Sequence, residues 1–163
     1  MGDDKETVLI TGASSGIGEA LAWVFAEHGH DMILVARSVD KLDALADELV
    51  GEYEVMVSVR STDLSQAGSA ESLARALHRE GRQVDILVNN AGVLEHGTFV
   101  YMAPEDHQRM LQLNVTAPMQ MAKQVLCLGE SFAAAPFSRG PVRFSDQARL
   151  QERMPRQHMP KYR

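Results

Sequence analysis

Short apolar segments alternate with longer amphipathic segments through most of this chain, and that alternation limits the folds it can form. Each apolar segment is rich in Val, Ile or Leu, as expected of a buried strand. The amphipathic segments repeat their apolar residues at helical spacing, and the first three end in glycine. The expected strands are 7–11, 31–36, 53–59 and 84–89, and the expected helices are 17–29, 38–51, 67–81, 104–113 and 115–126. This order predicts an α/β protein with a parallel sheet and right-handed crossovers.

Right-handed crossovers also predict how the layers are arranged. If the chain steps outward from the first strand to the third, the first two helices cover one face of the sheet. A return past the first strand puts the third helix on the other face and gives a doubly wound sheet of strand order 3-2-1-4. A crevice then opens between the first and fourth strands at their carboxyl ends, where such sheets usually bind ligands.

Composition excludes several classes of protein. The 163 residues are 45% hydrophobic and 23% charged, which is ordinary for a globular domain. No segment approaches the roughly 20 apolar residues of a membrane span, and the acidic start is unlike a signal peptide. The net charge of −6 argues against a nucleic-acid partner, and the six histidines show no metal-binding spacing. The single cysteine, Cys127, favours a reducing compartment, so a cytoplasmic protein is expected.

The segment TGASSGIG, residues 11–18, connects the first strand to the first helix. Gly12 permits a tight turn, while Gly16 and Gly18 allow backbone and helix to approach a ligand closely. The free N–H groups and positive dipole end of the following helix favour phosphate groups. The segment does not match the general G-x-G-x-x-G dinucleotide pattern. It nevertheless predicts a site for a diphosphate.

Four motifs, in this order and spacing, resemble those of the short-chain dehydrogenase/reductase family. They are TGASSGIG, the pair Asp63-Leu64, NNAG at 89–92 and the LNVTAP segment that contains Asn114. The resemblance covers about residues 5–126. It implies a Rossmann-like fold and a nicotinamide-dependent oxidoreductase that acts on alcohols and carbonyls.

The resemblance also implies roles for individual residues. The diphosphate would lie against Gly12, Ser14, Ser15, Gly16, Ile17 and Gly18. Asp63 and Leu64 would lie at the adenine, and Asn90, Ala91 and Gly92 beside the adenosine and nicotinamide riboses. Asn114 matches the asparagine that supports the family's proton relay.

Arg37 favours NADP over NAD as the cofactor. Folds that bind NAD place an Asp or Glu at the end of the second strand, where it accepts a hydrogen bond from the ribose hydroxyl. This chain has Ala36-Arg37-Ser38 at that place. A carboxylate would repel a 2′-phosphate, whereas a guanidinium forms charge-assisted hydrogen bonds with it.

The catalytic residues that the resemblance leads one to expect are missing. In the family, a serine after a fifth strand and a Tyr-x-x-x-Lys motif carry out the chemistry. Tyr53 is followed four residues later by Val57, Tyr101 by Glu105, and Tyr162 precedes only Arg163. Ser138 and Ser145 fall near the expected serine, but no strand pattern precedes them. We expect a chain that binds its cofactor and is catalytically impaired.

The sequence changes character near residue 127. Residues 1–126 hold nine Lys/Arg and 19 Asp/Glu, whereas residues 127–163 hold seven and three. We therefore predict a cofactor-binding domain over 1–126 and a basic, Arg/Pro-rich tail over 127–163. The tail is expected to be irregular or disordered, apart from a short helix at 145–154. Without a fifth strand the fourth becomes an open edge, through which the chain could associate with itself or another protein.

Three interpretations follow from these features. The first is an oxidoreductase chain whose catalytic half was lost by truncation or a shifted reading frame. The second is a non-catalytic module that binds NADP or a partner and is completed by another subunit at the fourth strand. The third is an active enzyme with an unfamiliar proton donor. The substrate cannot be inferred, because the family's substrate pocket is built largely from segments absent here.

Overall fold

The computed structural model describes residues 5–128. The tail predicted to begin at residue 127 lies outside the described residues from 129 onward. The helix expected at 145–154, Ser138, Ser145 and Tyr162 therefore also lie outside them.

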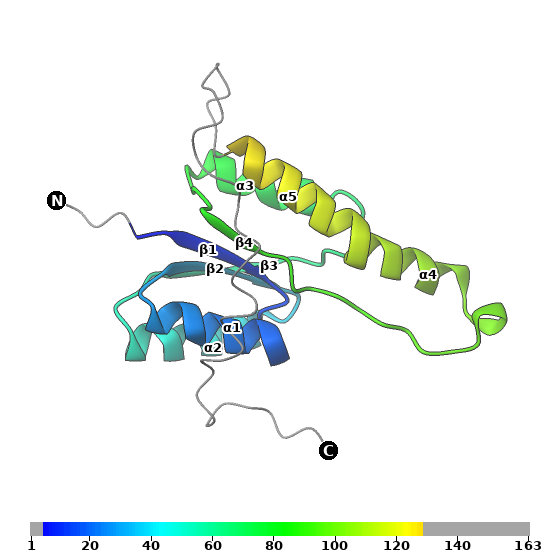
Figure 1. Cartoon of the computed structure of the whole chain (residues 1–163), viewed down its shortest axis with the longest axis horizontal. Coiled ribbons are helices and arrows are strands. Elements are labelled where there is room, and N and C mark those ends of the chain that lie inside the picture. Colours follow the sequence, from blue (N-terminus) through cyan, green and yellow to red (C-terminus); the bar gives the residue numbers. More distant parts are fainter. Residues whose placement is uncertain (1–4, 129–163) are drawn as a thin grey trace. The chain divides into compact units, whose positions relative to one another are not determined.

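Four parallel strands form one sheet, as the alternation predicts (Figure 1). The strands are β1 (Thr7–Thr11), β2 (Asp31–Ala36), β3 (Val57–Ser61) and β4 (Ile86–Val88). Their order is β3-β2-β1-β4, so the predicted order is confirmed. In the central register, Ile10 of β1 lies between Leu34 of β2 and Val88 of β4. Among the described residues β4 pairs only with β1, so its outer edge is open.

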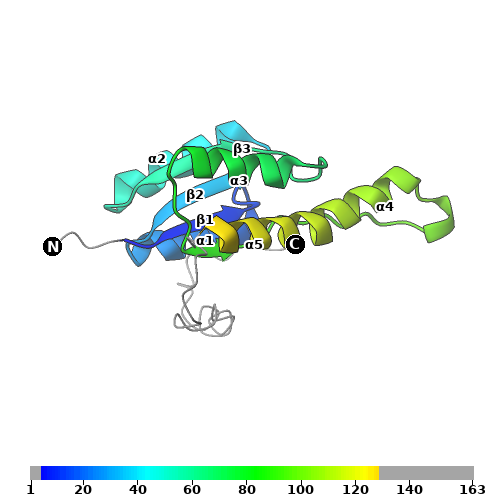
Figure 2. The same ribbon diagram turned by 90° about the horizontal axis from the view of Figure 1, so that it is seen from above.

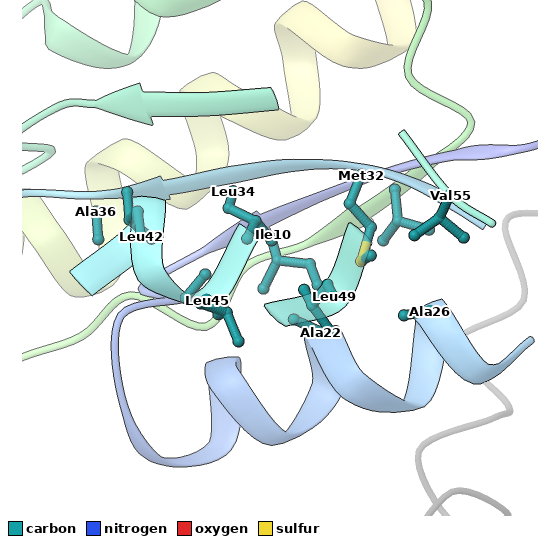
Figure 3. Close-up of a cluster of buried hydrophobic side chains, with 12 residues drawn as sticks. Ile10, Ala22, Ala26, Met32, Leu34, Ala36, Leu42, Leu45, Leu49 and Val55 are labelled. Atoms are coloured by element: carbon teal, nitrogen blue, oxygen red, sulfur yellow. The ribbon is translucent and has the colours of Figure 1, made fainter. Parts of the chain in front are cut away.

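The helices lie on two sides of this sheet, which is the layering expected from right-handed crossovers. α1 (Gly16–Glu27) and α2 (Val39–Glu52) cover one side, and α3 (Ser69–Arg79) and α5 (Ala117–Leu128) lie on the other. α4 (Pro104–Leu111) extends beyond the sheet. A buried cluster fills each interface. One includes Ile10, Leu34, Leu42 and Leu49 (Figure 3), and the other includes Leu9, Ile33, Leu73 and Met121.

The third strand begins later than the sequence predicts. β3 covers Val57–Ser61 rather than 53–59, and α2 ends at Glu52, one residue after its expected end. The residues between α2 and β3 form a connection in which Val55 is buried and Tyr53 packs edge-on against Trp23. This connection buries apolar side chains at alternate positions, which explains why its sequence resembles a strand. β4 is likewise shorter than predicted, covering Ile86–Val88 instead of 84–89.

The two helices expected at 104–113 and 115–126 form one nearly continuous helix (Figure 2). A π-helical turn at Gln112–Thr116 joins α4 to α5 where the sequence predicts a break. Pro118 has no N–H group for the ordinary helical bond to residue 114, and the wider turn lies directly before it. The turn places Asn114 opposite the segment that follows β4, as described below.

Candidate cofactor-binding site

The loop after β1 turns sharply and packs against the end of β4. Gly12 and Gly16 have φ values of +68° and +61°, which favour glycine. The Gly12 N–H donates to the carbonyl of Val35 at 2.7 Å. A Cβ on Gly18 would lie 2.3 Å from the Gly12 carbonyl oxygen, closer than any real side chain allows. This close packing explains why glycine is required at positions 12 and 18.

Thr11 joins β1 to the segment after β4. Its side chain is 2% exposed, and its hydroxyl donates to the Val88 carbonyl at 3.2 Å. The same oxygen accepts hydrogen bonds from the backbone N–H groups of Asn90 and Ala91, each at 3.0 Å. We did not single out Thr11 from the sequence, although a polar residue at the end of an otherwise apolar strand was the available signal.

Asn90 lies between the two motifs. Its side-chain amide donates to the carbonyls of Thr11 at 3.1 Å and Gly12 at 3.2 Å. The glycine loop and the NNAG segment, 79 residues apart in the sequence, therefore lie side by side as predicted. The Asn90 side chain holds these loops together, so its geometry is that of a residue that shapes the site.

The amino end of α1 opens beside this junction. Ser15 occupies the N-cap position in an extended conformation, and no side chain of residues 5–128 caps the helix. The first-turn N–H groups thus keep their capacity to bind an anion. Ser15 and Gly16 are exposed, Ser14 is half-buried and Ile17 is 62% exposed. This arrangement suits close contact with a diphosphate.

The two charged residues predicted to bind the cofactor follow the ends of β2 and β3. Arg37 directly follows β2 and is exposed. Asp63 follows β3 and accepts hydrogen bonds from the Ser65 hydroxyl at 2.6 Å and from its backbone N–H at 3.0 Å. The Leu64 side chain is 5% exposed and packs in the core.

The pKa of Asp63 lies below its usual value. The hydrogen bond from the Ser65 hydroxyl is the main cause, partial burial opposes it, and the charge of Arg37 adds a smaller lowering effect. We expect Ser65→Ala to raise the pKa of Asp63, measured by NMR of the carboxyl carbon. Because the folded-state pKa is depressed, the charged carboxylate stabilises the fold above about pH 4. That contribution disappears as the pH falls through the folded-state pKa.

Ser72→Ala provides a control for this measurement, since Ser72 is exposed on α3 and its side chain does not contact Asp63 in the described structure. An Asp63 pKa that is the same in Ser65→Ala as in the unaltered chain would contradict the assignment.

Asn114 contacts the segment after β4 through both atoms of its amide. Its Nδ2 donates to the Val93 carbonyl at 2.7 Å, and its Oδ1 accepts from the Val93 N–H at 2.9 Å. A Cβ on Gly92 would approach that Oδ1 to 3.3 Å. The surface is hollowed here, and the lining residues are Asn89, Ala91, Gly92, Val93, Leu94, Asn114 and Pro118. Asn114 therefore fixes one wall of an open hollow beside the predicted cofactor residues.

Neither tyrosine among the described residues lies at this hollow. Tyr101 is 88% exposed in the short 3-10 helix Phe99–Tyr101. Tyr53 lines a different hollow, with Lys5, Thr7 and Asp31 at the opposite ends of the strands. Burial, together with the nearby charges of Glu52 and Glu27, raises the pKa of Tyr53. The described residues hold no tyrosine placed to exchange a proton with a substrate at the hollow beside Asn114.

The sequence matches the short chain dehydrogenase family over residues 6–130, and the chain belongs to that family. Oxidoreductase UcpA of Salmonella typhimurium is 44% identical over 121 residues, which cover 74% of this chain and 45% of that protein. The NADP-dependent 3-hydroxy acid dehydrogenase of Schizosaccharomyces pombe is 36% identical over 125 residues, 76% of this chain and 48% of that protein.

A solved structure gives the same picture of the fold. The short-chain dehydrogenase from Sphingobium yanoikuyae, in complex with NADPH, is 43% identical and superposes with a TM-score of 0.69. The match covers 74% of this chain and 47% of that one. The chain thus spans about half the length of the curated relatives it matches.

Two further findings concern the described part of the chain alone. None of its helices combines the length and apolar character needed to cross a membrane. Residues 5–128 also contain no cluster of three or more His, Cys, Asp or Glu side chains able to hold a metal ion.

Proposed function

We propose that residues 1–126 bind NADP(H) as the cofactor half of an oxidoreductase that acts on alcohols or carbonyls. The observation that carries this proposal is Arg37 at the carboxyl end of β2, next to the crevice formed by the glycine loop and the NNAG segment. The NADPH-bound structure of the Sphingobium yanoikuyae enzyme and the NADP-dependent relative from Schizosaccharomyces pombe support this choice of cofactor. When bound, the nicotinamide group supplies or accepts a hydride.

Two features at the end of β2 suit the 2′-phosphate that distinguishes NADP from NAD. The Arg37 guanidinium is exposed and carries the complementary charge. Ser38 occupies the N-cap position of α2, but its hydroxyl does not cap the helix, in contrast to the usual role of such a serine. The first N–H groups of α2 and this hydroxyl thus keep hydrogen-bonding capacity beside Arg37.

The remaining predicted residues suit the rest of the cofactor. The uncapped amino end of α1, with the exposed Ser15, Gly16 and Ile17, would hold the diphosphate. Asp63 and the backbone of Leu64 would lie at the adenine, at the end of the neighbouring strand. The segment Asn90–Ala91–Gly92, fixed by Thr11 and Asn114, would lie along the riboses.

The 163 residues contain no Tyr-x-x-x-Lys motif. We therefore propose that this chain binds the cofactor but does not transfer hydride on its own, and that Asn114 has only its positioning role. Residues 127–163 are proposed to be a separate basic segment, outside the cofactor-binding domain. The single cysteine supports a reducing, cytoplasmic environment for this function.

The open edge of β4 favours a second candidate function, an NADP-binding module completed by another polypeptide. Among the described residues β4 pairs with β1 alone, and unpaired strand edges are sites at which other chains add strands. This candidate requires a stable complex. A chain that binds NADPH and melts cooperatively as a monomer would contradict it.

Thermal unfolding of the purified chain, with and without cofactor, tests the proposed function. At about 100 times the Kd, NADPH should add about 2.7 kcal/mol of stability and raise Tm by on the order of 10 °C, and NADH should raise it less. Arg37→Asp should reverse that order, because a carboxylate repels the 2′-phosphate and accepts from a ribose hydroxyl.

Arg82→Asp is the matched control, since it makes the same charge change at an exposed position after α3. It should leave the preference for NADPH unchanged. If neither cofactor raises the Tm of the unaltered chain, the proposed function is wrong.

A further inference from the structure

The end of β3 holds the backbone around Arg37 at two successive carbonyls. Ala36 and Ser61 are register partners at the ends of β2 and β3. The Thr62 N–H donates to the Ala36 carbonyl at 2.9 Å, and the Ser61 hydroxyl donates to the Arg37 carbonyl at 3.1 Å. The first bond continues the ordinary sheet ladder, whereas the second depends on the identity of one side chain.

The Ser61 hydrogen bond lies where the chain leaves the sheet. Arg37 stands between the last residue of β2 and the N-cap residue of α2, so neither the strand ladder nor a helical bond fixes its carbonyl. In the described structure, the Ser61 hydroxyl is the side-chain donor to that carbonyl. Without this bond, the Arg37 carbonyl would lose its side-chain donor, and only the hydrogen bonds at the Ala36 and Ser38 carbonyls would hold the backbone on either side.

Arg37 also has a competing acceptor nearby. Asp63 follows Ser61 by two residues, and the charge of Arg37 contributes to the lowered pKa of Asp63, after the larger effect of the Ser65 hydroxyl. When its backbone is less firmly held, the Arg37 guanidinium can turn toward that carboxylate more easily. Fixing the backbone of Arg37 therefore reduces the ordering cost of placing its side chain on a phosphate.

We infer that Ser61 is a positioning residue that raises the preference of this site for NADP(H) over NAD(H) by holding the carbonyl of Arg37. The inference rests on the proposed function. Ser61 does not touch the cofactor in this account and acts only through Arg37. NADH lacks the 2′-phosphate, so the loss of the Ser61 hydroxyl should weaken the binding of NADPH and leave that of NADH nearly unchanged.

Titration of the full chain with NADPH and with NADH, followed by cofactor fluorescence, tests the inference. Ser61→Ala should lower the ratio of NADPH to NADH affinity by about three- to ten-fold, the range expected for one hydrogen bond. Ser61→Thr keeps a hydroxyl and should restore most of the ratio. Ser58→Ala removes a serine hydroxyl from the same strand that has no side-chain hydrogen bond in the described structure, and it should leave the ratio unchanged.

The outcomes separate this inference from the proposed function. If the unaltered chain prefers NADPH and Ser61→Ala keeps the same ratio, the inference is wrong and the proposed function stands. An equal loss of affinity for both cofactors would also overturn it, because a merely structural role would weaken both. If the unaltered chain binds neither cofactor, the proposed function and the inference fail together.

Discussion

Replacing Gly18 by alanine is expected to lower the free energy of unfolding by about 3 kcal/mol and to abolish the rise in Tm caused by NADPH. The added Cβ would lie 2.3 Å from the Gly12 carbonyl oxygen and 2.5 Å from the Asn90 amide nitrogen. The first contact is with backbone, so no side-chain rotation can relieve it. The glycine loop would move away from the NNAG segment, and both parts of the proposed site would be displaced. Urea denaturation and melts with NADPH measure the two effects.

Gly51→Ala is the matched control for this substitution. Gly51 is also helical, but a Cβ there meets nothing within 4 Å and its φ is not positive. Alanine is favoured over glycine in a helix by up to about 1 kcal/mol, so this variant should be as stable as the unaltered chain or more so. If Gly18→Ala behaves like Gly51→Ala, the close packing of α1 on the glycine loop does not constrain the site.

The layered fold could be predicted because its signal is local and repeated. β1 and β2 were placed to the residue, since each is a continuous apolar run that packs on both faces of the sheet. β3 was misplaced, because burial of Tyr53 and Val55 in a connection also gives an alternating pattern. A single sequence does not distinguish a strand from an irregular connection in which every second side chain is also buried.

The site was predictable only in part, because several of its polar side chains bond to backbone that is distant in sequence. The motifs singled out Asn90 and Asn114, whose contacts with a cofactor remain predictions. They did not show that Asn90 holds the glycine loop, or that Asn114 holds Val93 from the middle of a π-helical turn. The expected break in the helix at Asn114 was also wrong, because the chain continues from α4 through this π-helical turn into α5. Every residue has the same backbone N–H and carbonyl groups, so the sequence does not show which of them a polar side chain will bond.

Thr11 shows most clearly how a polar residue can shape a site without being recognised from the sequence. Thr11→Val keeps the shape of the side chain but removes a hydroxyl that serves three backbone groups. The N–H groups of Asn90 and Ala91 would lose their acceptor, and each unsatisfied donor costs about 1–3 kcal/mol when shielded from water. We expect a loss of about 2–4 kcal/mol in the free energy of unfolding, measured by urea denaturation. The affinity for NADPH should also fall, because the NNAG segment is no longer held to β1.

Thr11→Ser separates the effect of the Thr11 hydroxyl on stability from the effect of its methyl group. It keeps all three hydrogen bonds and removes one buried methyl group, so it should cost only about 1 kcal/mol and preserve NADPH binding. Thr7→Val tests the same change at the other end of β1, where the threonine hydroxyl has no hydrogen bond to any described residue, and it should alter stability by less than about 0.5 kcal/mol. Equal losses in Thr11→Val and Thr11→Ser would mean that packing, and not the hydroxyl, holds the β4 segment in place. Because the proposed NADP site is formed by two loops joined mainly through Thr11 and Asn90, that result would also remove the structural reason for their alignment.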